Sequence, residues 1–289
     1  ALLPRAIWLQ TREMPECGIL LSKSPQPAAI PEDERRRCRT RDPLRKATRP
    51  MNAAKTIAVI PARGGSKRIP GKNKKIFCGK PMIAWSIEAA VASGLFDQIV
   101  VTTDDPEIAK IAQEYGAICP FERPEHLSDD HTPTLPVIRH AIETIEQGQD
   151  GALELVCCIY ATAPFITAQN LIEGHRTLQQ NQTLEFVFPV TSYAFPIQRA
   201  LYIDSDTGGM KMFQPEHADS RSQDLREAYH DAGQFYWGRR DAFMACDNMF
   251  AAKSAPVILP RNQVQDIDTP EDWDCAEQLY RFNLALNRD

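Results

Sequence analysis

The chain has 289 residues, of which 43% are hydrophobic and 25% charged, with a formal net charge of −5 at pH 7. This length and apolar content allow one large domain or two modest ones. No apolar run approaches the roughly 18 residues that a membrane helix needs, and the acidity argues against a general nucleic-acid binder. We therefore expect a soluble globular protein without a membrane or nucleic-acid partner, which can still bind small anions at a local basic patch.

The eight cysteines are scattered, without a CxxC pair or the spacing of a zinc site or disulfide framework. We expect reduced thiols in a cytoplasmic protein. The adjacent Cys157 and Cys158 lie in the apolar run LELVCCIY, which favours buried strand residues over redox chemistry.

Residues 1–50 differ in composition from the rest of the chain. They hold 7 of the 22 prolines and 11 Lys and Arg against 6 acids, without strand or helix periodicity. This composition predicts a disordered translated leader or a non-native extension, with the native protein beginning at Met51. A nucleic-acid-binding arm is the alternative.

Beyond the first fifty residues, apolar strand-like runs alternate with helical patterns. The runs are TIAVI, QIVVTT, AICPF, LELVCCIY and LEFVFPV. The alternation predicts a single α/β domain over residues 51–289, a three-layer Rossmann-like fold with a mainly parallel sheet and helices on both faces. Gly94 and Gly116 fit helix C-terminal caps, and Asp105 before a proline fits a helix start.

The alternation breaks at about residues 192–230, a polar and turn-rich segment. The chain then returns to strand patterns at GQFYWG and APVILP and ends in a helical pattern from about residue 269 to 286. The segment carries eight large apolar side chains, Tyr202 and Phe213 among them, which is too much apolar surface for a free loop. We expect a dimerisation excursion; the alternative is a segment that folds back on its own domain.

The stretch IPARGGSKRIPGKN follows the first predicted strand, a favoured place for a phosphate site in an open α/β sheet. Its glycines expose backbone N–H groups, Ser66 adds a hydroxyl, and Arg63, Lys67 and Lys72 supply positive charge. Together they predict a polyphosphate site. The spacing is not that of a P-loop and GxGxxG is absent, so neither an ATPase nor an NAD enzyme is expected. A solvated basic turn is the alternative.

The same stretch resembles the signature of the CMP-nonulosonic acid synthetases, the acylneuraminate cytidylyltransferase family that activates sialic-type sugars. The resemblance continues through TTDDPEIA, FERPEHLSDD, YATAPF and DIDTPEDW, over nearly all of residues 56–285. It implies a nucleotidyltransferase fold, a homodimer, and a reaction of CTP with a nonulosonic acid that releases pyrophosphate, in the service of surface glycan or flagellin glycosylation. A nucleotide-binding paralogue without activity is the alternative of another class.

By this resemblance, the basic stretch holds the triphosphate and nucleotide of CTP. Catalytic roles are implied for Arg63, Lys67 and Lys72, whose charge would stabilise the α-phosphate and the departing pyrophosphate. Nucleotide contacts are implied for Gly64, Gly65, Ser66, Asn73, Arg123 and Thr134. For Arg123 the alternative is a loop salt bridge. The other basic residues are expected to be solvated: Arg68, Lys74 and Lys75.

In QDIDTPEDW, an extended chain would send the carboxylates of Asp266 and Asp268 to the same side. Mg²⁺ prefers one or two carboxylates with water and phosphate oxygens, and the resemblance implies a metal at this position. The alternative for Asp268 is a cap on the last helix. Asp104 and Asp105 could also bind metal, but the proline after them favours helix capping.

The identity of the sugar depends on fewer residues. DAGQFYWG resembles the pseudaminic acid branch of the family, with Ala232 where sialic acid enzymes tend to carry Asn-Gly. Tyr160 stands where those enzymes often have Gln, and the methyl end of a 9-deoxy sugar would suit apolar surface such as Tyr236. Sugar contacts are implied for Tyr160, Gln234, Tyr236, Arg199 and Lys211, the last two across a dimer interface. Sialic, legionaminic or keto-deoxy-octulosonic acid is the alternative substrate, and a buried strand the alternative interpretation of QFYWG.

Overall fold

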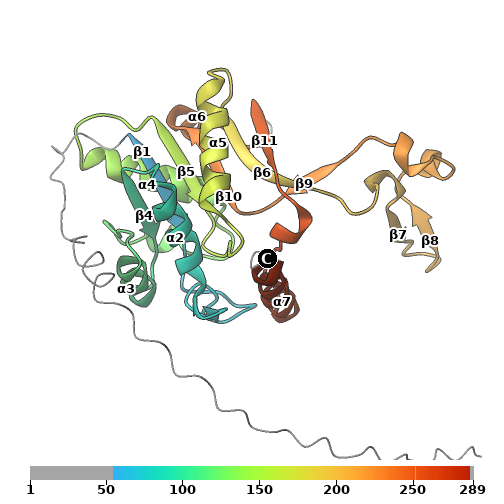
Figure 1. The fold of residues 1–289 in the computed structure, drawn as a ribbon, viewed down its shortest axis with the longest axis horizontal. Coiled ribbons are helices and arrows are strands. Elements are labelled where there is room, and N and C mark those ends of the chain that lie inside the picture. The colour runs from blue at the N-terminus through green and yellow to red at the C-terminus, as the bar shows by residue number, and fades with distance from the viewer. Residues whose placement is uncertain (1–54, 251, 287–289) are drawn as a thin grey trace, which may run out of the picture. The chain divides into compact units, whose positions relative to one another are not determined.

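The computed structural model describes residues 55–250 and 252–286 of the chain. These residues belong to one compact unit, Met51–Asp289. The leader or extension expected over residues 1–50 lies outside the described residues. Within the described part, helices cover both faces of a central sheet (Figure 1).

The central sheet has seven strands, with the order β11-β6-β10-β5-β1-β4 and β9 paired to β6. The strands are β1 Thr56–Pro61, β4 Gln98–Thr102, β5 Leu155–Ile159, β6 Phe186–Ser192, β9 Tyr229–Asp231, β10 Phe235–Arg239 and β11 Ser254–Ile258. β1 is parallel to β4 and β5, and β11 is parallel to β6. β9 and β10 run antiparallel to their neighbours. The predicted mainly parallel sheet is confirmed.

The apolar runs form the predicted strands, with one exception. AICPF does not form a strand: Ile118 makes a single bridge to Val100. Pro120 has no N–H to continue a ladder. The chain then turns away, and the Arg123 N–H donates to the Thr103 carbonyl at 2.9 Å. β5 is buried along its whole length, Cys157 and Cys158 included, because helices cover both of its faces.

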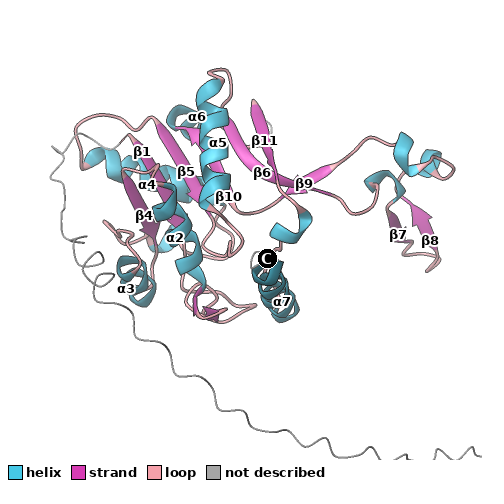
Figure 2. Cartoon of the chain, viewed as in Figure 1, coloured by secondary structure: helices cyan, strands magenta, loops and turns pink. Residues whose placement is uncertain are grey.

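Within the described part of the chain, six α-helices complete the layers (Figure 2). They are α2 Met82–Ser93, α3 Pro106–Glu114, α4 Thr134–Gln147, α5 Ala168–Gln180, α6 Arg240–Ala245 and α7 Pro270–Leu286. Successive strand residues point to opposite faces. Ile60 and Trp237 therefore pack with α2, α3 and α5, whereas Val59 and Tyr236 pack with α4 and α6. The three-layer prediction is confirmed.

Shorter elements connect the layers. The hairpin of β2 Ile76–Phe77 and β3 Lys80–Pro81 precedes α2. The short 3₁₀ helices are η1 Glu125–Leu127, η2 Ile197–Arg199, η3 Pro215–His217, η4 Ser222–Asp224 and η5 Arg261–Gln263. Among the residues described, no helix has both the length and the apolar character that crossing a membrane requires.

The predicted helix ends are confirmed. Gly94 caps α2 in the left-handed conformation, with φ 64°. Gly116, with φ 98°, directly follows Tyr115, the C-cap residue of α3. Asp105 caps the start of α3 by accepting from the N–H groups of Glu107 and Ile108. These small or polar residues satisfy backbone groups that the helix itself leaves free.

A third core cluster joins α7 to the loop that follows β1. Ile69 from the loop packs with Phe77, Ile267 and Trp273, each at most 3% exposed. This packing brings Ile267, which separates the two predicted metal-binding aspartates, against a segment about 200 residues earlier in the chain.

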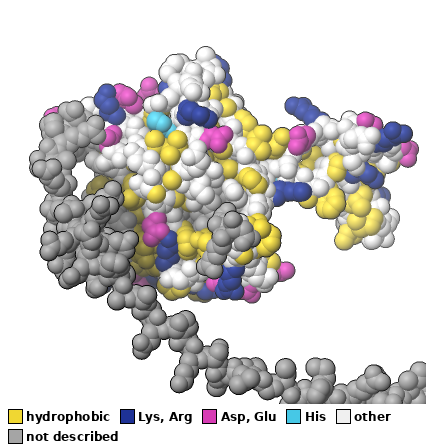
Figure 3. All heavy atoms as spheres, viewed as in Figure 1, with side chains coloured by type: hydrophobic (Ala, Val, Ile, Leu, Met, Phe, Trp, Pro, Cys, Tyr) yellow, Lys and Arg dark blue, Asp and Glu magenta, His cyan; other side chains and the backbone are white. Residues whose placement is uncertain are grey.

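The segment between β6 and β9 forms a hairpin of its own, β7 Leu201–Ile203 with β8 Met210–Met212. The hairpin stands apart from the three layers (Figure 1). Figure 3 shows hydrophobic side chains gathered on it, and Phe195 is 82%, Ile203 70% and Phe213 66% exposed. The alternative that this excursion folds back on its own domain is therefore wrong.

Candidate active site

Loops from several strands meet at one edge of the sheet, because β1, β4 and β5 are parallel and their carboxyl ends lie together. The basic loop, residues 62–75, follows β1, Asp104 follows β4, and Tyr160 follows β5. β10 is antiparallel to β5, with Phe235 opposite Ile159, so the start of β10 reaches the same edge. We call this the carboxyl edge.

Gly64 lies where the basic loop closely approaches the start of α3. Its N–H donates to Asp104 Oδ1 at 2.9 Å, and a Cβ added there would lie 2.9 Å from the Asp105 Cβ. A side chain would therefore collide at Gly64, whereas a Cβ at Gly65 would meet nothing within 4 Å. Asp105 caps α3 as predicted, but Asp104 holds the loop, so the capping prediction is wrong for Asp104.

Two residues predicted to contact the nucleotide also shape the loop. Asn73 is 8% exposed, and its Nδ2 donates to the Arg63 carbonyl at 2.9 Å. The Ser66 N–H donates to the Gly64 carbonyl at 3.0 Å. These bonds hold both ends of the basic loop in one conformation.

Arg63 and Lys67 share a carboxylate partner. Arg63 Nη1 donates to Asp130 Oδ1 at 2.5 Å and to the Asp129 carbonyl at 2.9 Å, and Lys67 Nζ pairs with Asp130. The hydrogen bond from Lys67, followed by that from Arg63, lowers the pKa of Asp130. The sequence stretch SDD was part of the resemblance, but no role was predicted for Asp130.

Arg68 and Lys72 share a second carboxylate. The Arg68 guanidinium binds Asp268 through two bonds of 2.8 and 2.9 Å, so the prediction that Arg68 is only solvated is wrong. Lys72 Nζ donates to the Ile267 carbonyl at 2.5 Å and lies 3.5 Å from Asp268 Oδ1. The four cations nearest the predicted phosphate position are thus held in pairs by two aspartates, which leaves an excess of positive charge.

The last two basic residues of the loop serve the fold. Lys74 Nζ pairs with Asp105 at 2.9 Å and with Glu107 at 2.5 Å, so the prediction that it is solvated is wrong. Lys75 is exposed, and its Nζ lies 4.2 Å from the centre of the Trp273 ring. This cation–π contact links the loop to α7.

Arg123 is a buried cation, 5% exposed, at the carboxyl edge. Its Nε donates to Thr102 Oγ1 at 3.2 Å and its Nη2 to the Thr102 carbonyl, and no carboxylate among the described residues forms an ion pair with it. Burial lowers the pKa of Arg123 to about 10, with Asp104 opposing the shift. The salt-bridge alternative is wrong, and a bound anion would compensate this buried charge.

Four residues form what we call the tyrosine cluster: Thr134, Tyr160, Tyr236 and Asp231. Thr134 Oγ1, at the first residue of α4, lies 3.5 Å from the Tyr160 hydroxyl. The two tyrosine rings are 5.3 Å apart, and the Tyr236 hydroxyl donates to Asp231 Oδ2. Burial, more than any other cause, raises the pKa of both tyrosines, so their hydroxyls stay protonated.

The structure brings three of the predicted sugar contacts together but not the other two. Gln234 is 3% exposed, its carbonyl accepts from the Tyr160 N–H at 2.9 Å, and its Nε2 donates to the Gln263 carbonyl. Arg199 lies on the excursion, as does Lys211, whose Nζ pairs within the hairpin with Asp204 at 2.5 Å. One chain therefore does not gather Arg199 and Lys211 with the tyrosine cluster.

Asp266 and Asp268 flank the buried Ile267 beside the basic loop. Burial and then the charge of Asp268 raise the pKa of Asp266. A divalent cation would offset the repulsion between these two carboxylates. The two aspartates therefore offer oxygen ligands of the kind that Mg²⁺ prefers. The described residues contain no group of three or more His, Cys, Asp or Glu suited to a metal, so further ligands would have to come from substrate or water.

Asp268 does not cap α7, so that alternative is wrong. Thr269 Oγ1 accepts from the Asp272 N–H at 3.2 Å, and Asp272 accepts in return from the Thr269 N–H at 2.8 Å. This reciprocal pairing satisfies the start of the helix. The Asp268 side chain is left free for the basic loop.

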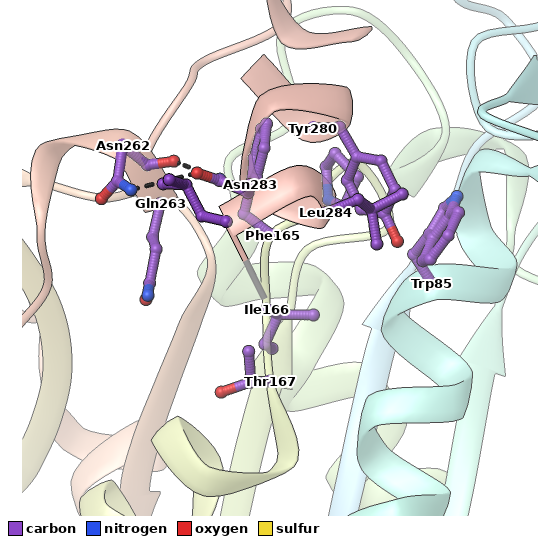
Figure 4. A pocket seen from close by; sticks show the side chains of 11 residues that line it. Trp85, Phe165, Ile166, Thr167, Asn262, Gln263, Tyr280, Asn283 and Leu284 are labelled. Carbon is purple, nitrogen blue, oxygen red and sulfur yellow. Dashed lines mark hydrogen bonds between the residues drawn. The ribbon is translucent and has the colours of Figure 1, made fainter. Parts of the chain in front are cut away.

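A pocket of about 260 Å³ lies elsewhere, between α2, the loop after β5 and α7 (Figure 4). Trp85 and Tyr280 line it with rings 4.6 Å apart, and the side chains of Asn262 and Asn283 bind each other at its rim. None of the predicted site residues lines it, and its lining contains no charged residue. The carboxyl edge, which carries the cations, is therefore the candidate active site.

The chain matches the family model described as Cytidylyltransferase over residues 57–279. It is 47% identical over 229 residues to the pseudaminic acid cytidylyltransferase of Campylobacter jejuni subsp. jejuni serotype O:23/36 (strain 81-176), covering 79% of this chain and 97% of that protein. It is 34% identical over 213 residues to a Helicobacter pylori (strain ATCC 700392 / 26695) protein, with 74% of this chain and 40% of that protein covered. That protein is named "Pseudaminic acid cytidylyltransferase and UDP-2,4-diacetamido-2,4,6-trideoxy-beta-L-altropyranose hydrolase".

The fold also resembles a solved structure, CMP:2-keto-3-deoxy-manno-octonic acid synthetase complexed with CTP. The TM-score is 0.58 at 18% sequence identity, covering 79% of this chain and 99% of that one. At this identity the likeness concerns the fold, which agrees with the predicted nucleotidyltransferase architecture.

Proposed function

The chain belongs to the cytidylyltransferase family, and on that premise we propose that it couples CTP to pseudaminic acid, giving the CMP-sugar and pyrophosphate. The observation that carries the proposal is the 47% identity, over 97% of its length, to a relative with the name of that activity. The carboxyl edge supports it, since a loop of cations and a tyrosine cluster lie at one edge of the same sheet.

The basic loop would bind the triphosphate by exchange of anions. Asp130 bridges Arg63 and Lys67 in the structure described here, and Asp268 bridges Arg68 and Lys72. Phosphate oxygens form the same charge-assisted bonds as carboxylate oxygens, so CTP can replace these partners without moving the cations far. The buried Arg123 supplies a further cation for the nucleotide, together with the exposed backbone of Gly65.

In the transfer step, the anomeric hydroxyl oxygen of the sugar forms a bond to the α-phosphorus of CTP. The bond from that phosphorus to the bridging oxygen breaks, pyrophosphate leaves with the electron pair, and the hydroxyl proton is released. Arg63, Lys67 and Lys72 would stabilise the charge that develops on the phosphates. Their positions are set before substrate arrives, because the loop is held by Asn73 and Ile69.

Asp266 and Asp268 are the residues we assign to Mg²⁺, on the basis of their oxygen-only donor set and their position beside Lys72. When bound, the ion would supply further charge neutralisation for the phosphates of CTP. Arg68 and Lys72 would then exchange their bonds to Asp268 for bonds to phosphate.

The tyrosine cluster would receive the sugar. The half-buried ring of Tyr160, packed against the buried ring of Tyr236, offers apolar surface that suits the methyl end of a 9-deoxy sugar. Ala232, 5% exposed, leaves this part of the carboxyl edge without the Asn-Gly of sialic acid enzymes. Since CTP and free thiols such as those of Cys157 and Cys158 are cytoplasmic features, we place the reaction in the cytoplasm.

We also propose a homodimer that buries the excursion. Its exposed apolar side chains, Phe195 and Phe213 above all, have no cover within the described chain. Such a patch is typical of a protein interface. Arg199 and Lys211 would then reach the partner's tyrosine cluster and meet the carboxylate of its sugar.

The proposal is tested by measuring pyrophosphate release with CTP, Mg²⁺ and a panel of pseudaminic, legionaminic, N-acetylneuraminic and keto-deoxy-octulosonic acids. We expect the highest kcat/KM with pseudaminic acid. Preference for another sugar would overturn the substrate assignment, and no release with any sugar would leave only nucleotide binding. Omission of Mg²⁺ tests the metal in the same assay.

A further inference from the structure

The two carboxylate oxygens of Asp231 have different surroundings. Oδ2 accepts a hydrogen bond from the Tyr236 hydroxyl, whereas Oδ1 is buried and has no donor among the described residues. A buried oxygen left without a donor is costly, and such atoms in native proteins are nearly always paired. Oδ1 therefore needs a donor from outside the described chain.

Neighbouring donors are already engaged. The Tyr236 hydroxyl is bound to Oδ2, and the Tyr160 N–H is bound to the Gln234 carbonyl. His230 Nδ1 contacts the backbone carbonyl of Asp231 at 2.9 Å rather than its side chain. As the described residues are placed, none of these groups donates to Oδ1.

Asp231 also lies where a sugar would be received. It ends β9 opposite Val190 of β6, and through Tyr236 it is joined to Tyr160 and Thr134 at the carboxyl edge. Tyr236 is 1% exposed and holds Oδ2 in place, so the carboxylate has a defined orientation. A rigid acceptor at the edge of a site is suited to selecting a ligand by its donors.

We propose that Asp231 determines sugar specificity by accepting a hydrogen bond at Oδ1 from an acetamido N–H of the sugar. This inference rests on the proposed function, because pseudaminic acid carries acylamino groups, and the name of one relative refers to a diacetamido sugar. A carboxylate favours a neutral N–H donor and repels the sugar's own carboxylate. The sugar is therefore oriented with its acetamido side toward Asp231 and its carboxylate toward cationic groups.

The first test needs no variant of the protein. Two analogues of pseudaminic acid are used, each with one acetamido N–H replaced by an ester oxygen, which keeps the shape and removes the donor. We expect one analogue to lose about 10- to 100-fold in kcat/KM with the unaltered protein, because it leaves the Asp231 oxygen unpaired. Equal kcat/KM for both analogues and the parent sugar would overturn the inference.

The second test changes the acceptor. Asp231→Asn keeps the size of the side chain but can present an N–H₂ group, so we expect the KM for the sugar to rise about 10- to 100-fold while the KM for CTP stays unchanged. The penalty of the ester analogue should shrink or vanish in this variant. An unchanged sugar KM, or an ester penalty that persists at full size, would refute the role of Asp231.

Two further variants complete the design. Tyr236→Phe removes the bond that orients Asp231, so a smaller rise in the sugar KM is expected. Asp241→Asn removes a carboxylate that is 92% exposed and should change neither constant. If Asp231→Asn does not fold, the analogue comparison on the unaltered protein still decides. Failure of the proposed function is distinct, because then no pseudaminic acid derivative would be turned over.

Discussion

The carboxyl edge and the excursion differ in whether a single chain provides partners for their side chains. At the edge, Asp130 and Asp268 each pair with two cations of the basic loop, so these cations have partners before any ligand binds while an excess of positive charge remains. On the excursion, Phe195 and Phe213 remain 82% and 66% exposed. One region is suited to small anions that exchange with its own aspartates, and the other presents apolar surface that the proposed homodimer would bury. Variants at the edge should therefore change chemistry, and variants of the excursion should change assembly.

Asp268→Ala should have the largest effect. It removes a proposed Mg²⁺ ligand and the partner of Arg68, so we expect kcat to fall by at least about 100-fold, with the oligomeric state unchanged. The melting temperature should change little, because Thr269 caps α7.

Thr269→Ala is the matched control for that variant. Loss of a cap costs about 1 kcal/mol, so its melting temperature should fall by roughly 2–4 °C while kcat is retained. Near-normal turnover of Asp268→Ala together with a lower melting temperature would mean that Asp268 stabilises the fold and does not bind the metal.

Phe213→Ser should weaken the proposed dimer contact of the excursion and leave the carboxyl edge of the same chain unchanged. The Phe213 ring packs 4.9 Å from Tyr202 on an exposed hairpin, and loss of a central aromatic contact typically weakens an interface by about 30-fold or more. We expect light scattering at micromolar concentration to give a lower average mass, because the dimer dissociates, and we expect the activity to fall as well. Ile76→Ser, at a position 57% exposed outside the excursion, should leave the mass unchanged. A fully active monomer of the unaltered protein would contradict the dimer.

Arg123→Met removes the buried cation of the carboxyl edge that has no carboxylate partner among the described residues. We expect the KM for CTP to rise about 10- to 100-fold, with the melting temperature unchanged or higher, since a buried unpaired charge destabilises the fold. Arg139→Met is the control, as its guanidinium binds the carbonyls of Phe243 and Cys246 away from the edge. It should lower the melting temperature and leave the KM for CTP in place.

Asp130→Asn should have the smallest effect, and in the opposite direction. It removes the charge that competes with triphosphate for Arg63 and Lys67, so we expect the KM for CTP to fall about 2- to 3-fold at low salt. The gain should disappear at high salt, where such pairs are screened. Because those cations lower its pKa, Asp130 stays charged across neutral pH, and the gain should not depend on pH there. A higher KM would mean that Asp130 helps to bind CTP.

Local rules predicted most of the elements. β5 is recognisable from the run LELVCCIY, because a strand covered on both faces must be apolar throughout. The caps at Gly94 and Asp105 follow from backbone groups that any helix leaves unpaired. For AICPF the prediction of a strand is wrong, because apolar composition does not show whether a neighbouring ladder continues past Pro120.

The chain's own sequence determined the alternation of strands and helices, the position of the basic loop after the first strand, and the apolar content of the excursion. These depend on residues that lie close together along the chain, where spacing and composition act directly. Only the tertiary structure decided that Asp268 binds Arg68, that Arg123 is buried without a carboxylate, and that Asp231 meets Tyr236. Contacts of this kind depend on which strands place their ends at the same edge of the sheet. Spacing along the chain does not reveal them, since Arg68 and Asp268 lie 200 residues apart.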